Sequence, residues 1–142
     1  MAGKVPAPRR GAYRTPVHLE PGLVARASLT VAKEDTALAL RSGDVPVLAT
    51  PRVVLLAEEA TVAAVEGRLG PGHTTVGYRV QLDHLAPTAI GGTVEAEAML
   101  EAIEGRRLTF RVSVNDGHGL VAAGRITRVV VDRERFLERA SG

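Results

Sequence analysis

The hydrophobic pattern of the chain changes its period at one point, and this change limits the folds that are open to it. From Thr50 to Gly67 the stretch TPRVVLLAEEATVAAVEG carries apolar residues at helical spacing, with Thr50 suited to the N-cap and Pro51 to the first helical position. Gly67 predicts that the helix ends just before it, and GPG at 70–72 is a strong break. From residue 74 onward, apolar and polar residues alternate with a period of two, which is typical of a strand.

Four strands are predicted after the helix and one before it. The segment 93–105 is rich in helix-forming residues, yet its apolar residues from Val94 to Ala102 alternate with glutamates and Met99, which favours a strand. The turn EGRR at 104–107 then leads into RLTFRVSVND, which alternates cleanly. Further predictions are strands over 23–32, 74–84 and 120–132, a loop with at most a short helix over 33–50, and a short closing helix in RERFLERA.

This order predicts an α+β domain, in which an antiparallel sheet packs on one long helix. Residues 1–22 are expected to be a basic, proline-containing arm, and residues 23–142 the folded domain. The first fourteen residues carry four cations and no acid, which leaves 14 basic and 16 acidic residues in the rest of the chain. The folded part is therefore not basic.

Composition excludes several classes of function. The chain has no cysteine, so it can form neither a disulfide nor a thiolate metal site. Two Tyr, two Phe and no Trp leave few surfaces on which bases could stack, so no nucleic-acid partner is expected. No apolar run reaches the ~20 residues of a membrane span, and the N-terminal residues lack the apolar segment of a secretory signal. We expect a cytoplasmic protein without a membrane partner.

Two adjacent glutamates in the middle of the predicted helix have different surroundings. At about 100° per residue, Glu59 shares one stripe with Arg52 and Glu66, which is expected to face water. Glu58 lies instead on an apolar side, next to Val54, Val62 and Val65. A carboxylate there loses hydration unless a cation or a hydrogen-bond donor meets it, and enzymes tune catalytic carboxylates in this way. The alternatives are a bond to a backbone amide, a position at a subunit boundary, or a side chain that extends into water.

His84 is the histidine whose position favours a functional role. It ends the strand predicted over 74–84, on the side of its apolar residues Val76, Tyr78, Val80 and Leu82. A core or edge histidine is the alternative. The other histidines, His18, His73 and His118, fall in or beside loops, and no metal-ligand spacing occurs, so no metal site is expected. Gly77 interrupts the same strand, and such a glycine commonly marks a bulge or a place where another backbone or a ligand comes close. A local accident of packing is the alternative.

The order of elements and the spacing of four residues resemble the hotdog-fold acyl-CoA thioesterases, and more narrowly their fluoroacetyl-CoA thioesterase-like branch. The resemblance covers residues 23–137. It depends on AT with a glutamate eight residues after the threonine (Thr50, Glu58), on GYRVQLDH with a glycine seven residues before the histidine (Gly77, His84), and on EAIEGRRLTFRVSVNDG. It implies a hotdog fold, in which the sheet wraps around one long central helix. It also implies that Thr50, Glu58 and His84 are catalytic and that Gly77 lies at the acyl site.

The reaction that this resemblance implies is hydrolysis of an acyl-CoA thioester, with CoA as part of the substrate and no separate cofactor. His84 would activate water, Thr50 would hydrogen-bond the reacting group, and Glu58 would orient the water or attack the carbonyl itself. Eight residues of straight helix separate Thr50 from Glu58 by about 12 Å, so either the chain folds back or two chains of a homodimer build the site. The fluoroacetyl-specific enzymes carry phenylalanines over the acyl pocket where this chain has ALRSGDVPVLAT, so we expect a small or unspecified acyl group.

Other functions remain open from the sequence. A hotdog protein could bind acyl-CoA or another small ligand without turnover, and a hotdog hydratase or dehydratase would need an Asp/His motif that we do not find. The arm could dock on anionic partners. Conceivable contacts for the phosphates of CoA are Arg79, Arg106, Arg107, Arg125 and Arg128.

Overall fold

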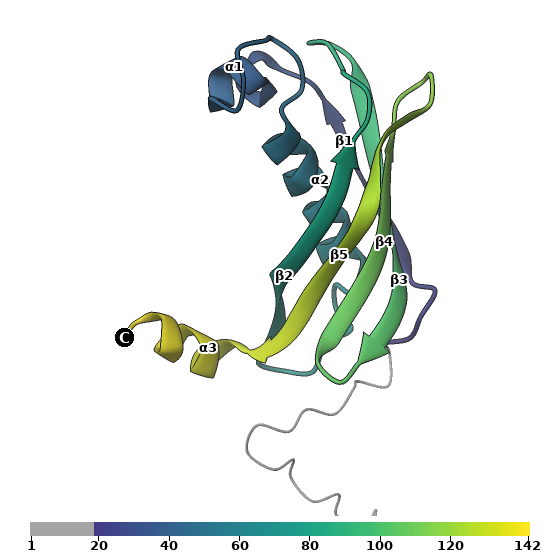
Figure 1. Cartoon of the computed structure of the whole chain (residues 1–142). Helices are drawn as coiled ribbons and strands as arrows, with labels where there is room; N and C mark the ends of the chain where they lie inside the picture. Colours follow the sequence, from purple (N-terminus) through teal and green to yellow (C-terminus); the bar gives the residue numbers. More distant parts are fainter. Residues whose placement is uncertain (1–18) are drawn as a thin grey trace, which may run out of the picture.

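The computed structural model describes residues 19–142; residues 1–18, which include His18 and most of the expected arm, lie outside the described part (Figure 1). The elements are β1 Val24–Thr30, the 3-10 helix η1 Lys33–Asp35, α1 Ala37–Leu40, α2 Thr50–Ala64, β2 His73–His84, β3 Thr93–Glu104, β4 Arg107–Asn115, β5 Leu120–Asp132 and α3 Arg133–Ala140. Before β1, Leu19 is buried in the core and the Gly22 amide donates to the Leu100 carbonyl at 2.8 Å. Residues 19–22 therefore pack on the domain.

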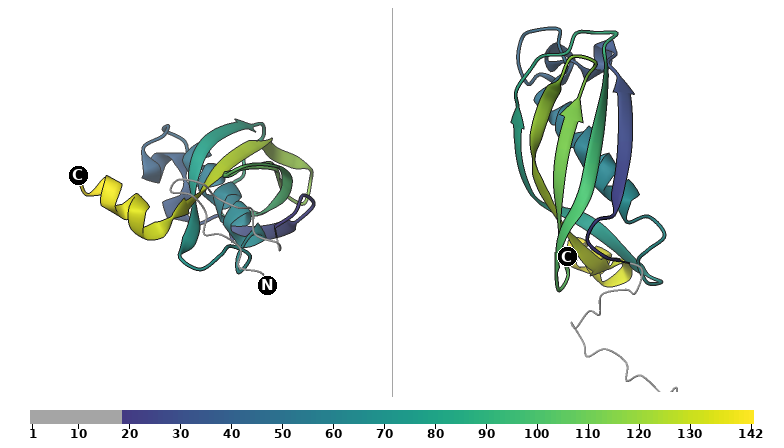
Figure 2. Two further views of the ribbon diagram at one scale, coloured as in Figure 1. Left: turned by 90° about the horizontal axis from the view of Figure 1, so that it is seen from below. Right: turned by 90° about the vertical axis from the view of Figure 1, so that its right-hand side faces the viewer.

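Five antiparallel strands form one sheet in the order β1-β3-β4-β5-β2. Gly105 and Arg106 form the two-residue turn between β3 and β4, and Gly105 has φ 62°, a conformation that residues with a side chain rarely adopt. The sheet curls around α2, which lies on its concave side (Figures 1 and 2). The prediction of an antiparallel sheet wrapped around one long helix is confirmed. β1 and β2 are its two edge strands.

Small side chains allow α2 to lie close to the sheet. Ala57 and Ala60 on the helix and Ala96 and Ala98 on β3 have no exposed surface, and larger residues such as Phe110 fill the core beside them. The helix lies against β1 and β3 more than against β2 and β5. The inner side of β2 is consequently only partly covered.

The alternating pattern predicted β3 correctly against its helix propensity. Its inner residues from Val94 to Leu100 are fully buried. The alternation ends at a bulge between Leu100 and Ala102, and Ile103 then takes the inner position opposite the buried Leu108. The prediction that Ala102 continues the inner face is therefore wrong.

β2 has a bulge directly after Gly77, where its pairing with β5 shifts by one residue. Because side chains alternate with a period of two, the shift exchanges the two sides of the strand. The prediction that Val76 and Tyr78 share the inner face with later residues is wrong, and Tyr78 is 51% exposed. His84 lies on the inner side as predicted, where it pairs with the buried Ala122.

The helix α2 begins and ends earlier than predicted. Ala49 occupies the N-cap, Thr50 is the first helical residue, and Pro51 is the second. Thr50 is therefore not the cap, and its hydroxyl bonds to His84. The helix ends at Ala64, after which the chain turns through Gly67 with φ 74°.

α3 extends away from the sheet at the end of β5 (Figures 1 and 2). None of its residues is buried, and Leu137 is 56% exposed. Asp132 caps it by accepting from the Arg135 amide at 3.0 Å. Across residues 19–142, no helix combines the length and the apolar character that crossing a membrane requires.

Candidate active site

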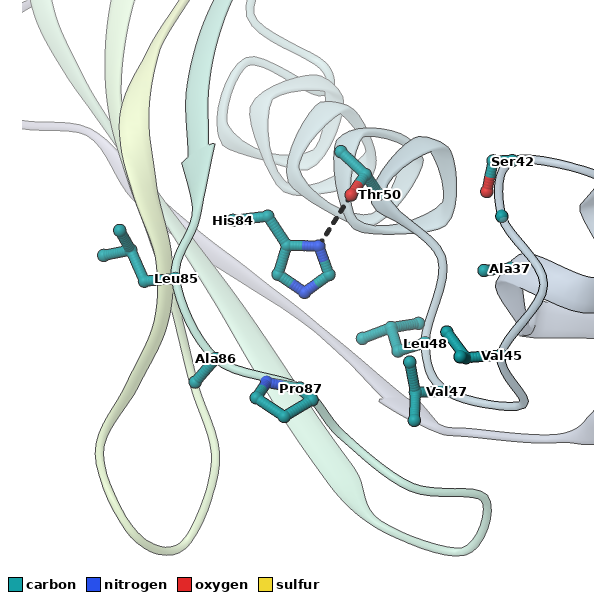
Figure 3. A pocket seen from close by; sticks show the side chains of 11 residues that line it. Ala37, Ser42, Val45, Val47, Leu48, Thr50, His84, Leu85, Ala86 and Pro87 are labelled. Atoms are coloured by element: carbon teal, nitrogen blue, oxygen red, sulfur yellow. Dashed lines mark hydrogen bonds between the residues drawn. The ribbon is translucent and has the colours of Figure 1, made fainter.

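The side chains of Thr50 and His84 meet at the N-terminus of α2 (Figure 3). Thr50 Oγ1 lies 2.8 Å from His84 Nδ1, a hydrogen bond that joins the first helical residue to the last residue of β2. The hydroxyl that sequence patterns assign to a helix cap is engaged with the imidazole instead. This bond fixes the orientation of the ring.

The second ring nitrogen of His84 faces a cavity. Nε2 is buried and has no hydrogen-bond partner within residues 19–142. The cavity has a volume of ≈ 320 Å³. Its walls are formed by Ala37, Ser42, Gly43, Val45, Val47, Leu48, Thr50, His84, Leu85, Ala86 and Pro87 (Figure 3). A buried imidazole nitrogen beside an otherwise apolar space is suited to proton transfer with a bound reactant.

Asp35 joins the segment before α2 to the helix through hydrogen bonds. Its buried carboxylate accepts from Arg52 Nε at 3.0 Å, and its carbonyl accepts from the Ala49 amide at 2.9 Å. Arg52 is also 3.5 Å from Glu59, and its side chain is only 18% exposed, so the prediction that Arg52 lies on the water-facing stripe is wrong. Because Thr50 follows Ala49 directly, these bonds fix the place of its hydroxyl.

Glu58 has a cation as its partner. Arg128 on β5 donates from Nη1 to Glu58 Oε2 at 3.2 Å, from Nε to Thr75 Oγ1 at 2.9 Å, and from Nη2 to the Thr75 carbonyl at 3.0 Å. Arg128 is 7% exposed, and this burial lowers its pKa, although the charge of Glu58 opposes the shift. The carboxylate is thus paired, while the Glu58 side chain keeps 31% of its surface exposed.

Sequence reasoning did not assign Arg128 to the site, although a signal was present. Ile126, Arg128 and Val130 share one parity in β5, and both apolar neighbours are fully buried. A cation on the buried side of a strand needs a buried acceptor or anion nearby. The strand pattern together with Glu58 could therefore have predicted the pair.

Gly77 provides space for the Glu58 carboxylate. A Cβ atom at Gly77 would lie 2.5 Å from Glu58 Oε2, which is closer than real contacts of this kind allow. Gly77 is also the residue at which the β2 bulge begins. The bulge expected of a glycine within this strand is present, and the group that comes close is the Glu58 side chain rather than another backbone or a ligand.

The four predicted site residues form two separate groups within one chain. Thr50 and His84 share the cavity at the start of α2, whereas Glu58 and Arg128 line another of ≈ 340 Å³ with Leu55, Glu59 and Val62. Glu58 lies eight residues further along α2 than Thr50, about 12 Å along the axis. His84 lies seven positions beyond Gly77 along β2, roughly 20 Å. A single chain therefore does not bring Glu58 to His84.

Of the other histidines in the described part, His118 lies in the turn between β4 and β5, whereas His73, expected in a loop, is the first residue of β2 and pairs with Asp132. His73 Nδ1 lies 3.0 Å from the Pro71 carbonyl, and the His118 amide donates to Asp116 at 2.7 Å. Within residues 19–142, no three side chains of the types His, Cys, Asp or Glu gather in a group that could hold a metal ion.

Comparisons with known proteins identify a family and individual proteins that are similar to this chain. Residues 31–134 match the family described as Fluoroacetyl-CoA-specific thioesterase. The fluoroacetyl-CoA thioesterase of Streptantibioticus cattleyicolor is 40% identical over 90 residues, which span 63% of this chain and 65%, less than two thirds, of that relative. A solved fluoroacetyl-CoA thioesterase structure has a TM-score of 0.82 at 31% identity, covering 87% of this chain and 96% of that one. A hot-dog-like protein of Thermanaerovibrio acidaminovorans has a TM-score of 0.80 at 25% identity, over 86% and 90% of the two chains.

The curled five-stranded sheet around one helix, shared with these solved structures, defines a hotdog-fold protein. The family match runs from just after β1 into the start of α3 and includes all four site residues. The chain belongs to the Fluoroacetyl-CoA-specific thioesterase family.

Proposed function

We propose that the protein is an acyl-CoA thioesterase, which hydrolyses an acyl-CoA thioester to the free acid and CoA. The observation that carries this proposal is the Thr50–His84 pair. Its 2.8 Å bond holds the ring, while Nε2 faces a largely apolar cavity without a partner among residues 19–142. An imidazole held in this way can take a proton from a water molecule. Membership of the family supports the same reaction.

In the proposed reaction, a water molecule attacks the carbonyl carbon of the thioester while His84 Nε2 takes one of its protons. The carbon–sulfur bond then breaks, and the proton passes from Nε2 to the leaving sulfur, so that a carboxylic acid and a thiol result. Nδ1–H donates to Thr50 Oγ1 throughout, which keeps the ring in place. At the N-terminus of α2, Pro51 has no N–H and the amides of Arg52 and Val53 donate to the Ala49 carbonyl, so the Thr50 amide is the group there that would meet the negative charge on the carbonyl oxygen. Water is the only other reactant, and CoA belongs to the substrate.

We assign Glu58 the role of orienting the attacking water. Its charge is shared with Arg128 at 3.2 Å, and a carboxylate paired with a guanidinium is a weaker nucleophile than a free one. Arg128, held in turn by Thr75, is a positioning residue for this carboxylate. Gly77 leaves the space that the carboxylate occupies, beside the proposed acyl site.

Two copies of the chain would complete this site. The free edge of β2 can pair with β2 of a second copy about a two-fold axis, and in such antiparallel pairing the residue numbers of opposed residues have a constant sum. An axis at Gln81 sets Val80 of one copy opposite Leu82 of the other, both on the inner side, and because Tyr78 is the extra residue of the bulge it sets Gly77 opposite His84. Both residues face the inner side, so Glu58 of the first copy would lie beside His84 of the second.

The surface next to this edge favours such a homodimer. Apolar side chains on α2 and β2 are between 40% and 51% exposed in the single chain, namely Leu55, Val62, Tyr78 and Val80. Pairing would remove them from water and would cover an edge that otherwise promotes aggregation.

Hydrolysis of acyl-CoA, followed with a thiol reagent that detects free CoA, tests the proposal. We expect Thr50→Ala, His84→Ala and Glu58→Gln each to lower kcat/KM by about 10² or more. Glu59→Gln changes an exposed carboxylate on the same helix and is the matched control, with activity within about two-fold of wild type. Equal losses of activity in Glu58→Gln and Glu59→Gln would show that Glu58 has no specific role in the site. Saturable acyl-CoA binding without release of CoA would indicate the non-catalytic alternative.

Mixing two inactive variants tests whether the site combines two chains. In a mixed dimer of His84→Ala and Glu58→Gln chains, one site carries both defects and the other carries none. Co-expression is therefore expected to restore about a quarter of the wild-type activity, because half of randomly formed dimers are mixed and each has one intact site. If both residues act within one chain, every site of the mixed dimer carries one defect and activity stays low. The cytoplasmic location expected from the sequence stays a prediction.

A further inference from the structure

Two charged side chains on the outer side of β2, the side away from α2, have no ionic partner among residues 19–142. Arg79 and Asp83 are both exposed, and their neighbours on β5 are the uncharged Thr127 and Ala123. Neither forms a salt bridge with any other part of the described chain. The guanidinium of Arg79 lies over the Tyr78 ring, 5.6 Å from its centroid. The free edge of β2 therefore presents one cation and one carboxylate on the same side.

Gln81 lies between these two residues on the outer side, and the cation beside it is already paired. Arg125 is the neighbour of Gln81 on β5, and its Nε donates to Glu101 Oε2 at 2.8 Å. The charge of Arg125 is therefore engaged within its own chain. The outer side of β2 thus carries a cation, a neutral amide and a carboxylate at every second residue, with the amide in the middle.

This order of charges is complementary to itself about one two-fold axis. Directly opposed residues of an antiparallel pair lie on the same side of the sheet, so the axis passes at a residue and not between two residues. An axis at residue 79 or 83 sets like charges opposite each other, and an axis at residue 80 or 82 sets both charges opposite uncharged residues. An axis at Gln81 sets Arg79 of each copy opposite Asp83 of the other.

The same axis completes the two-chain site proposed above. It sets Gly77 of one copy opposite His84 of the other, and Glu58 approaches Gly77 closely. Moving the axis by one residue slides the two strands by two residues, about 7 Å, and separates Glu58 from His84 of the other copy. The charges on the outer side and the catalytic groups on the inner side therefore require the same register.

We infer that Arg79 of each copy forms an ion pair with Asp83 of the other, and that these two symmetric pairs fix the register of β2 against β2 in the homodimer. Opposed side chains of an antiparallel pair have Cβ atoms about 5 Å apart, within reach of a guanidinium and a carboxylate. Arg79 and Asp83 are positioning residues, because they act through the placement of Glu58 and His84. The inference rests on the homodimer of the proposed function and names the contacts that set its register.

Charge reversal, followed by sedimentation velocity over a range of protein concentrations, tests the ion pairs. Arg79→Asp and Asp83→Arg each set like charges opposite each other at both symmetric positions, so the dissociation constant of the homodimer is expected to rise about ten-fold or more. A mixture of the two variants pairs two carboxylates of one chain with two cations of the other. Its dissociation constant is expected to lie within about three-fold of the wild-type value, as is that of the double variant.

Glu20→Arg is the matched control, because it reverses an exposed carboxylate just before β1, at the opposite edge of the sheet. Its dissociation constant should stay within about two-fold of wild type. Recovery in the mixture also excludes misfolding, since the same chains fail to associate when they are alone. Hydrolysis of acyl-CoA, measured near the wild-type dissociation constant, is expected to fall in each single variant and to return in the mixture.

A single introduced cysteine tests the register directly, because the chain has no cysteine of its own. An axis at Gln81 sets the two copies of this residue opposite each other, within the Cα distances that a disulfide spans. Gln81→Cys is therefore expected to give a disulfide-linked dimer on mild oxidation. Val80→Cys and Leu82→Cys are expected to stay unlinked, because the two copies of each residue are offset along the strand.

The outcomes separate the interface from the catalytic activity. Dimers that recover in the mixture and in the double variant, with linkage at residue 81, support the inference. It is overturned by a monomeric wild-type chain, by single variants that associate as tightly as Glu20→Arg, by a mixture that stays monomeric, or by linkage at residue 80 or 82 instead. Association is measured without substrate, so a protein that pairs as expected but releases no CoA overturns the proposed function while the ion pairs stand.

Discussion

At the scale of single residues, the site depends on a carboxylate whose surroundings come from three elements. Glu58 belongs to α2, its partner Arg128 to β5, and the space for its oxygen to Gly77 of β2. The helical wheel shows that Glu58 leaves the water-facing stripe, but it cannot show which group meets it. That partner is 70 positions away in the sequence, and only the pairing of β2 with β5 brings it near.

Replacement of Gly77 by Ala tests the space around the carboxylate. The new Cβ would lie 2.5 Å from Glu58 Oε2, so the carboxylate must turn away from its present place beside Arg128. We expect kcat/KM to fall by about 10-fold or more, because misplacement of a catalytic group by about 1 Å is costly. The melting temperature should fall by only a few degrees, since Gly77 does not adopt a left-handed conformation and Arg128 keeps its two bonds to Thr75 when Glu58 turns away.

Gly117→Ala is the control for this variant. A Cβ atom at Gly117 meets nothing within 4 Å, and Gly117 also has no left-handed conformation. Its activity should match that of wild type. If the two alanine variants have the same activity, the close approach of Glu58 to Gly77 does not matter for catalysis.

At the scale of elements, the sequence predicted the type and order of the five strands, α2 and α3, because hydrophobic period is a strong signal over long segments. It did not predict that η1 and α1 both form in the segment expected to be a loop with at most a short helix. It failed where one extra residue changes the side of a strand. Alternation places Tyr78 and Ala102 on inner faces, but Tyr78 is the extra residue of the bulge in β2 and Ala102 follows the bulge in β3, which a simple alternation cannot reveal. In β2, Gly77 indicated a bulge, whereas β3 carries no glycine or proline at its bulge.

The start of α2 shows a similar limit. A threonine before a proline is a good cap by local pattern, yet the tertiary bond from Thr50 to His84 takes its hydroxyl. The backbone before it is held from outside the helix, through the bonds of Asp35 to Arg52 and Ala49. Local propensity describes neither contact, because both join residues distant in the sequence.

Asp35→Ala tests how much the bonds of Asp35 contribute to the free energy of unfolding. The change leaves the half-buried Arg52 without its closest acceptor and removes the carboxylate bond to the Ala32 amide. We expect the free energy of unfolding to fall by about 2–3 kcal/mol, as is usual when one partner of a largely buried charged pair is removed. Urea denaturation measures this loss.

Glu34→Ala is the matched control, since Glu34 is the exposed acidic neighbour of Asp35 in η1. Its free energy of unfolding should stay within about 0.5 kcal/mol of the wild-type value. A similar loss in both variants would mean that the segment is held by its packing rather than by Asp35.

At the scale of the whole molecule, one chain contains all the groups of the proposed site but keeps them in two places. The Thr50–His84 pair and the Glu58–Arg128 pair lie at different points along β2 and α2, in different cavities. The sequence anticipated this separation from helix geometry alone, because eight helical residues already exclude direct contact between Thr50 and Glu58. It could not locate the surface that would join the two halves, which depends on the uncovered edge of the sheet.

Because the edge of β2 is free in the single chain, the fraction of chains that are active would depend on protein concentration. If two chains share each site, the active dimer predominates only at protein concentrations above its dissociation constant. Dilution below that concentration then abolishes activity while the chains stay folded. Turnover per chain should then drop as the sample is diluted through the range where sedimentation velocity records the change from two chains to one. A rate per chain that stays constant across that range would instead describe an enzyme that works alone.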